Sequence, residues 1–228
     1  MNIKIAKTAG FCFGVERAVS LVEETAQQGK RVFTLGPIIH NRHVVRHFEG
    51  IGVAVADTPD QLPDGCAVII RSHGIPRAVF EALEKRDVEI IDATCPFVKR
   101  IHALVMSAER EGRTPVIIGN RTHPEVVAIA GWCSHPKVFE SAKELAAWLE
   151  EDPKNRDLPI SMVSQTTSTK KIWESCVEIV KKECTNHKIF DTICKATENR
   201  QAQAAALAKT CDAVVVVGDK TSSNTGCN

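Results

Sequence analysis

The sequence lacks several features by which large classes of proteins are recognised. Its 29 basic and 28 acidic residues nearly cancel, so a net charge of +1 gives no field to attract nucleic acid or a membrane surface. No apolar run approaches the length of a membrane span, and no secretory leader pattern follows the first methionine. Nine cysteines are present, but no CxxC pair that would indicate a zinc ribbon or a ferredoxin-type cluster. We therefore expect a cytoplasmic chain whose thiols stay reduced, with neither nucleic acid nor membrane as a partner.

The composition is that of a globular protein with enough apolar surface for a core, since 43% of the residues are hydrophobic and 25% are charged. Short apolar runs alternate with stretches of helical periodicity along the chain, which predicts α/β units with mostly parallel sheets. Ligands in such sheets bind beyond the carboxyl ends of the strands. The runs predicted as strands are residues 31–35, 53–55, 67–71, 89–92, 114–118, 160–163, 188–191 and 213–217.

An internal repeat organises the chain around three cysteines, Cys12, Cys95 and Cys194, each placed where an apolar run gives way to the start of a helix. A glycine that closes the next apolar run follows each cysteine after 24 residues, at positions 36, 119 and 218. An aspartate stands three residues before the second and third cysteines, and an arginine follows each of the three by about one turn or slightly more, at positions 17, 100 and 200. The chain therefore contains three copies of one unit.

The repeat predicts three α/β lobes related by a pseudo-threefold axis, with boundaries at 13–95, at 96–193, and at 194–228 together with 1–12. Such an axis would aim the three cysteines at one centre. In each of the first two copies, a further strand ends in a cluster of polar residues. The third copy has no such strand or cluster. We therefore expect the third lobe to be incomplete and the chain to be C-terminally truncated.

The three repeated cysteines allow two interpretations. Helix N-termini stabilise thiolates, and three soft thiolates suit an iron–sulfur cluster better than zinc, which takes a fourth ligand in a structural site. Alternatively, the three cysteines are structural and share only their origin by duplication. Five of the six cysteines outside the repeat are interpreted as small buried hydrophobic residues: Cys66, Cys133, Cys176, Cys184 and Cys211.

Polar residues that follow the predicted strands form a candidate anion site. The donors that could converge on a diphosphate are His40, His73, His123, Ser222, Ser223 and Asn224. A single loop histidine is more often solvated than a ligand, and only the repetition favours binding. Glu125, directly after His123-Pro124, has an ordinary explanation as an acidic residue in the first turn of a helix.

Eight motifs carry a resemblance to a known family: FCFGVERAV (11–19), GPIIHN (36–41), RSHG (71–74), DATCP (92–96), THPE (122–125), SQTT (164–167), TIC with AT (192–197) and SSNT (222–225). In these motifs, and over nearly its whole length, the chain resembles the 4-hydroxy-3-methylbut-2-enyl diphosphate reductases of the methylerythritol phosphate route to isoprenoids. The resemblance implies a three-lobed α/β fold around a [4Fe-4S] cluster.

The resemblance also implies a role for each candidate residue. Cys12, Cys95 and Cys194 would hold three irons and leave the fourth open. The six residues of the candidate anion site would bind the diphosphate, Glu125 would be the proton source, and Thr166 would position the substrate hydroxyl. The expected reaction is a two-electron reductive dehydroxylation to isopentenyl or dimethylallyl diphosphate, with ferredoxin or flavodoxin as the electron donor.

Two alternatives to a functioning reductase follow from the same residues. One is a truncated, catalytically inactive fragment of that enzyme. The other is a phosphate-binding α/β protein whose cysteines are only structural.

Overall fold

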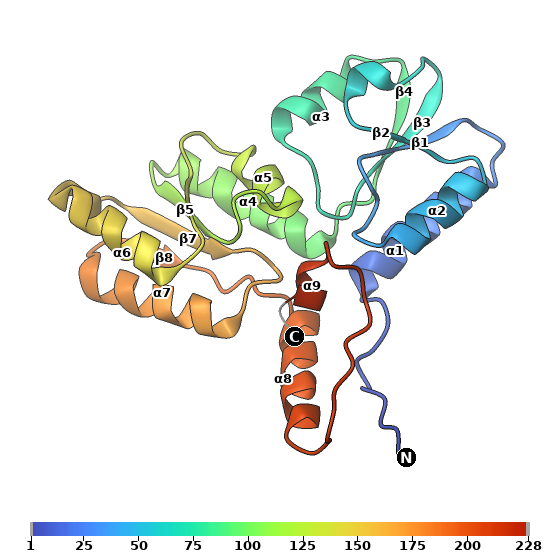
Figure 1. The fold of residues 1–228 in the computed structure, drawn as a ribbon. Coiled ribbons are helices and arrows are strands. Elements are labelled where there is room, and N and C mark those ends of the chain that lie inside the picture. The colour runs from blue at the N-terminus through green and yellow to red at the C-terminus, as the bar shows by residue number, and fades with distance from the viewer. Residues whose placement is uncertain (1, 227–228) are drawn as a thin grey trace. The chain divides into compact units, whose positions relative to one another are not determined.

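The computed structural model describes residues 2–226, which fall into two compact units (Figure 1). Within the described residues, the first unit comprises residues 2–72, 79–95 and 194–226, and the second comprises residues 73–78 and 96–193. Each unit contains one four-stranded sheet with helices packed on it. The fold is therefore α/β, as the alternation of apolar runs predicts, and the predicted division into three lobes stays a prediction.

The sheet of the first unit consists of β1 (Val32–Leu35), β2 (Ala54–Ala56), β3 (Cys66–Ile70) and β4 (Val88–Asp92). All neighbours are parallel and the strand order is β2-β1-β3-β4. The connections contain α2 (Arg42–Gly50), the 3-10 turn η1 (Pro59–Gln61) and α3 (Arg77–Glu84), while α1 (Phe13–Ala26) precedes the sheet. The central strand β3 is buried at every position, as expected for a strand covered on both faces.

The helices α1 and α2 bury their apolar stripes against this sheet. Ala18 and Val22 of α1 and Phe48 of α2 share a cluster with Ala67 and Ile69 of β3. The N-cap Asn41 of α2 accepts hydrogen bonds from two backbone N–H groups of the first turn, which fixes where this helix begins.

The sheet of the second unit consists of β5 (Thr114–Ile118), β6 (Lys137–Phe139), β7 (Ile160–Ser164) and β8 (His187–Ile189). Its strands are also parallel, in the order β6-β5-β7-β8. The helices are α4 (Pro96–Arg110), α5 (Pro124–Ala130), α6 (Ala142–Glu151) and α7 (Lys170–Glu183), with a 3-10 turn η2 (Pro153–Arg156). The strand order is equivalent to that of the first sheet, which confirms that the chain contains a structural repeat.

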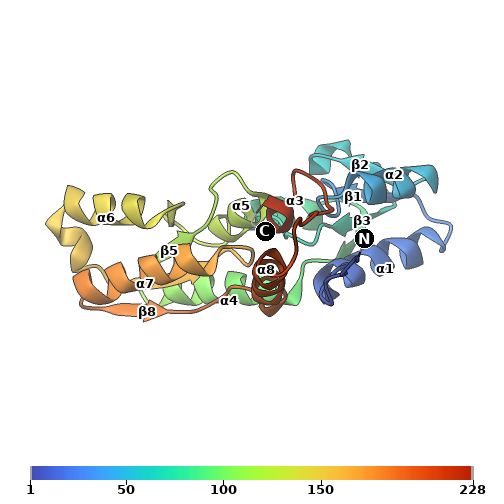
Figure 2. The ribbon, with the colours of Figure 1, turned by 60° about the horizontal axis from the view of Figure 1, so that its bottom comes forward.

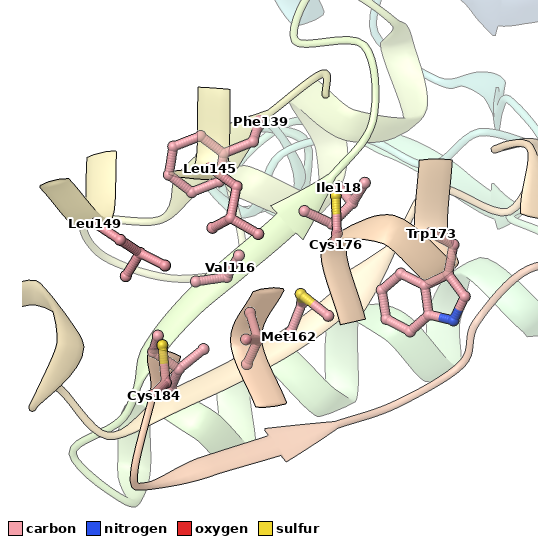
Figure 3. Packing of buried hydrophobic residues seen from close by; sticks show 11 residues of the cluster. Val116, Ile118, Phe139, Leu145, Leu149, Met162, Trp173, Cys176 and Cys184 are labelled. Atoms are coloured by element: carbon pink, nitrogen blue, oxygen red, sulfur yellow. The ribbon is translucent and has the colours of Figure 1, made fainter. Parts of the chain in front are cut away.

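Two clusters cover the two faces of the second sheet. On one face, α6 and α7 pack on β5 and β7, where Leu145, Trp173 and Cys176 surround Val116 and Met162 (Figure 3). The other cluster joins the opposite-facing residues of the same strands to α4 and α5, with Ile101, Val105, Ile117, Val126, Ile129 and Val163 as its fully buried members. Alternate residues of each strand thus face opposite cores, which is why these strands read as continuous apolar runs.

The first unit also contains α8 (Lys195–Ala208) and the short α9 (Ser223–Gly226). Figures 1 and 2 show the chain after α8 turning back beside that helix to reach α9. A hydrogen bond of 3.3 Å from Thr197 Oγ1 to Asn224 Oδ1 joins the start of α8 to α9.

One predicted strand is absent from the described residues, and one observed strand was not predicted. Residues 213–217 are irregular, with Val215 83% and Val217 92% exposed, because β-propensity alone does not form a strand without a neighbour to pair with. The strand β6 was missed because only three residues form it, and just one of them, Phe139, is buried. No helix in residues 2–226 combines the length and the hydropathy required to cross a membrane.

Candidate functional site

The loops that lead into two of the repeated cysteines have the same turn. The Oδ1 atom of Asp92 accepts a hydrogen bond from Thr94 N at 2.9 Å, and that of Asp191 accepts one from Ile193 N at 3.2 Å. Each is a turn in which an aspartate bonds the backbone two residues on. The aspartate three residues before Cys95 and Cys194 therefore shapes the backbone that delivers the cysteine.

Two of the repeated cysteines stand at helix N-caps. Cys12 is the N-cap of α1 and Cys194 the N-cap of α8, and neither side chain makes a capping hydrogen bond. Both are half-buried. The thiols of both residues thus lie at the N-terminal end of a helix.

Cys95 lies at the carboxyl end of β4 and directly before α4, and it is also half-buried. Its backbone N–H donates to Ser72 O at 3.0 Å, which ties it to the segment after β3. Its sulfur lies against the first turn of α1: a Cβ atom on Gly14 would be 2.6 Å from Cys95 Sγ. The thiol of Cys95 is therefore next to the helix that Cys12 begins.

Three of the cysteines outside the repeat differ from these three in their burial. Cys66, Cys176 and Cys184 are buried, as predicted, whereas Cys133 and Cys211 are half-buried. Burial raises the pKa of the Cys176 thiol to about 11 and, with Glu109, that of the Cys133 thiol to about 12. Protonated thiols of this kind do not bind metal, which agrees with their interpretation as structural residues.

The anion-site candidates of the first unit lie on two loops that are joined to each other. His40 precedes α2, and Ser222, Ser223 and Asn224 lie at the start of α9. Asp219 accepts hydrogen bonds from the N–H of Arg42 at 3.2 Å and from its Nε at 3.1 Å. Asp219 is not among the residues predicted from the sequence. The sequence shows only the local part of its role, because the same carboxylate also accepts hydrogen bonds from the N–H and Oγ1 of Thr221, two residues later.

Burial and the positive charge of Arg71 lower the pKa of His40, while Asp219 raises it to a smaller extent. His40 therefore favours the neutral imidazole more than an exposed histidine does. A neutral imidazole can still donate one N–H to a phosphate oxygen.

In the second unit, His123 has its tautomer set by its position as the N-cap of α5. Its Nδ1 accepts a hydrogen bond of 3.1 Å from Glu125 N, so the ring proton is on Nε2. The ring of His73 lies edge-on to that of His123, with centroids 5.5 Å apart. Two of the predicted histidines are thus neighbours, and one is arranged to donate from Nε2.

The most buried of the candidate residues is Glu125, which is 3% exposed. Its two carboxylate oxygens accept hydrogen bonds from Thr166 N at 2.6 Å and from Thr166 Oγ1 at 2.7 Å. Burial raises the pKa of Glu125 and exceeds the effect of these two hydrogen bonds, which lower it. The carboxyl group therefore holds a proton at a higher pH than an exposed glutamate, as a general acid must.

The ends of β5 and β7 approach each other closely, and this approach positions Glu125 and Thr166. A Cβ atom on Gly119 would lie 2.7 Å from Gln165 Cβ and 2.9 Å from Val126 Cγ2. These two residues are the chain neighbours of Thr166 and Glu125, respectively. The repeated glycine at the end of β5 is therefore explained by space, because any side chain there would displace the residues next to the acid pair.

The chain matches the family model described as LytB protein over residues 3–227. A relative from Caldanaerobacter subterraneus, named 4-hydroxy-3-methylbut-2-enyl diphosphate reductase, is 43% identical over 99% of this chain and 78% of its own length. A relative of the same name from Clostridioides difficile is 38% identical over 99% of this chain and 80% of its own length.

Two solved structures are also similar to this chain. One, of (E)-4-hydroxy-3-methyl-but-2-enyl diphosphate reductase, the terminal enzyme of the non-mevalonate pathway, matches with a TM-score of 0.77 and 38% identity over 98% of this chain and 79% of its own. The other, the E-1-hydroxy-2-methyl-but-2-enyl-4-diphosphate reductase of Plasmodium falciparum, matches with a TM-score of 0.88 and 29% identity over 96% of this chain and 69% of its own.

Proposed function

Because this chain belongs to the LytB protein family, we propose that it reduces 4-hydroxy-3-methylbut-2-enyl diphosphate to isopentenyl and dimethylallyl diphosphate. The reaction breaks the allylic C–O bond, consumes two electrons and two protons, and releases the hydroxyl oxygen as water. The observation that carries the proposal is the buried Glu125 carboxyl group with its two hydrogen bonds from Thr166, since this pair can hold and deliver a proton.

We assign the electron-transfer group to Cys12, Cys95 and Cys194, and the residues fit it. Three half-buried thiols lie directly before helices, and Gly14 leaves space where a side chain would meet the sulfur of Cys95. Soft thiolate ligands select iron–sulfur clusters. A [4Fe-4S] cluster, when bound by these three cysteines, would supply the two electrons, which a donor such as ferredoxin or flavodoxin would deliver.

The diphosphate is assigned to His40, His73, His123, Ser222, Ser223 and Asn224. These side chains offer N–H and O–H donors without a cluster of fixed positive charges. The Nε2–H of His123 is set to donate because its Nδ1 is occupied by the backbone of α5. Hydrogen bonds to an ionised phosphate are stronger than those between neutral groups.

Glu125 and Thr166 act on the hydroxyl group that leaves. The raised pKa keeps Glu125 protonated at a higher pH than usual, so it can transfer its proton to the departing oxygen. Thr166 holds the carboxyl group through both its backbone N–H and its hydroxyl, and we assign the same hydroxyl to the positioning of the substrate oxygen.

The first experiment measures iron and acid-labile sulfide per chain after anaerobic reconstitution, where a complete cluster gives roughly four of each. The second compares Glu125→Gln with the unsubstituted protein. The variant should lose turnover by at least about 100-fold while keeping its iron and its affinity for the substrate, because only the transferable proton is removed. Loss of substrate binding or iron in this variant would assign Glu125 to the fold instead.

A further inference from the structure

Two of the three repeated arginines bind the backbone next to a cysteine of the candidate cluster site. Arg17, in α1, donates from Nη2 to Asp92 O at 3.2 Å and from Nη1 to Thr94 O at 3.4 Å. These carbonyls lie three residues and one residue before Cys95. Arg17 is half-buried, so its guanidinium is fixed between α1 and the loop that delivers this cysteine.

Arg200, in α8, makes the equivalent contacts to the loop that delivers Cys12. Its Nε donates to Thr8 O at 3.2 Å and its Nη2 donates to Gly10 O at 2.7 Å. Gln203, one turn further along α8, accepts from both the N–H and the hydroxyl of Thr8, at 2.8 and 2.7 Å. The N-terminal segment before Cys12 is thus fixed to α8 at several points.

The two sets of contacts form a series. The helix that Cys194 begins holds the backbone before Cys12, and the helix that Cys12 begins holds the backbone before Cys95. We propose that Arg17 and Arg200 are positioning residues that set the places of the cysteine sulfurs relative to one another. The proposal rests on the proposed function for what those sulfurs bind.

The close packing at Gly14 makes the position of Cys95 sensitive to this series. A Cβ atom on Gly14 would lie only 2.6 Å from Cys95 Sγ, so sulfur and helix are in direct contact. Arg17 is one turn further along the same helix and binds the chain on the N-terminal side of Cys95. The helix therefore contacts both the sulfur and the backbone that carries it.

Arginine suits this role better than lysine. Its planar guanidinium presents several N–H donors in a fixed geometry and can reach two carbonyl oxygens at once, whereas a lysine ammonium acts as a flexible point charge. Arg17→Lys and Arg200→Lys therefore keep the positive charge and remove the paired contact. Arg86→Lys is the matched control, because Arg86 also donates to a backbone carbonyl of the first unit, Leu62 O, but within the described residues it makes no hydrogen bond to the segments before Cys12 and Cys95.

The first test follows iron loss from the reconstituted proteins during incubation with a chelator under anaerobic conditions. Groups that orient metal ligands typically contribute 10- to 100-fold to metal affinity, so we expect iron loss about tenfold faster in each of the two lysine variants. The control should lose iron at the rate of the unsubstituted protein. Equal rates in all four proteins would overturn the proposal, and so would failure of either lysine variant to fold without iron, since that arginine would then serve the fold in general.

The second test needs no cluster and therefore separates this proposal from the proposed function. The iron-free proteins are alkylated with iodoacetamide, and labelling of each cysteine is followed by mass spectrometry. Arg17→Lys should increase the labelling rate of Cys95 several-fold more than that of Cys12, and Arg200→Lys should have the opposite preference. A uniform change at both cysteines, or none, would refute the series even in a protein that binds iron normally.

Discussion

Replacing Thr166 by valine should alter stability in a way that depends on the ionisation of Glu125. The substitution removes the hydroxyl that donates to a carboxylate oxygen at 2.7 Å and leaves the backbone N–H that donates to the other oxygen at 2.6 Å. A hydrogen bond to an ionised group contributes about 1.5–3 kcal/mol and one between neutral groups about 0.5–1.5 kcal/mol. The cost of the substitution should therefore be larger by about 1 kcal/mol when Glu125 is ionised.

The direction of the pH dependence follows from the raised pKa of Glu125. Its folded-state pKa lies above the ordinary carboxyl value of 4.5, because burial outweighs the two hydrogen bonds. The group therefore contributes its full stability below about pH 4.5, and that contribution is lost as the pH rises through the folded-state value. Removing the hydroxyl raises the pKa of Glu125 further. In Thr166→Val the stability that Glu125 contributes should therefore continue to decrease up to a higher pH.

The assay is urea unfolding of the cluster-free protein between pH 4 and pH 9, with a double-mutant cycle that includes Glu125→Gln. In the glutamine background the cost of Thr166→Val should not change with pH, because no carboxyl group remains to ionise at this position. The coupling between the two residues should appear only as the pH increases. A cost of Thr166→Val that is equal at all pH values in the Glu125 background would refute the assignment of the hydroxyl as a donor to the ionised carboxylate.

Two further predictions concern residues that position the candidate site. Gly119→Ala should destabilise the chain by about 1–3 kcal/mol in urea unfolding and reduce turnover, because the added Cβ would overlap the residues next to the acid pair; Gly50→Ala, where no atom lies within 4 Å of the added Cβ, should do neither. His123→Ala should lose the N-cap of α5 and about 1 kcal/mol of stability, whereas His123→Asn should retain most of that stability, and both should weaken substrate binding in a titration. Equal stability of the two histidine variants would contradict the capping role.

Much of the fold could be predicted because its signals are local. Buried parallel strands such as β3 and β7 produce uninterrupted apolar runs, and glycine or proline marks the turns between elements. Ser141 and the glutamate three residues later form a local pattern typical of a helix start, and Ser141 is the N-cap of α6. The irregular residues 213–217 show the limit of this approach, since a strand also requires a partner that propensity does not reveal.

The candidate site was only partly predictable, because some of its contacts join distant parts of the chain. The spacing of the repeat indicated Cys12, Cys95 and Cys194, since each lies at a boundary that local sequence defines. The hydrogen bonds between Glu125 and Thr166 span 41 residues, and no periodicity connects the two. Only the family resemblance assigned them roles, and it did not predict that they bind each other.

The two sheets have equivalent strand orders, but the residues that follow corresponding strands make different contacts. The ends of β3 and β7 both supply contacts that hold the chain before a cysteine: Ser72 O accepts from Cys95 N, and Ser164 exchanges hydrogen bonds with Thr192. The residue that stands two positions after the last residue of each strand makes different contacts in the two copies. It is Ser72 in one and Thr166 in the other, and only Thr166 binds the buried acid. The first copy thus makes this contact between two backbone groups and the second makes it through the Thr192 side chain, and we expect the Thr166 side chain to serve the proposed reaction.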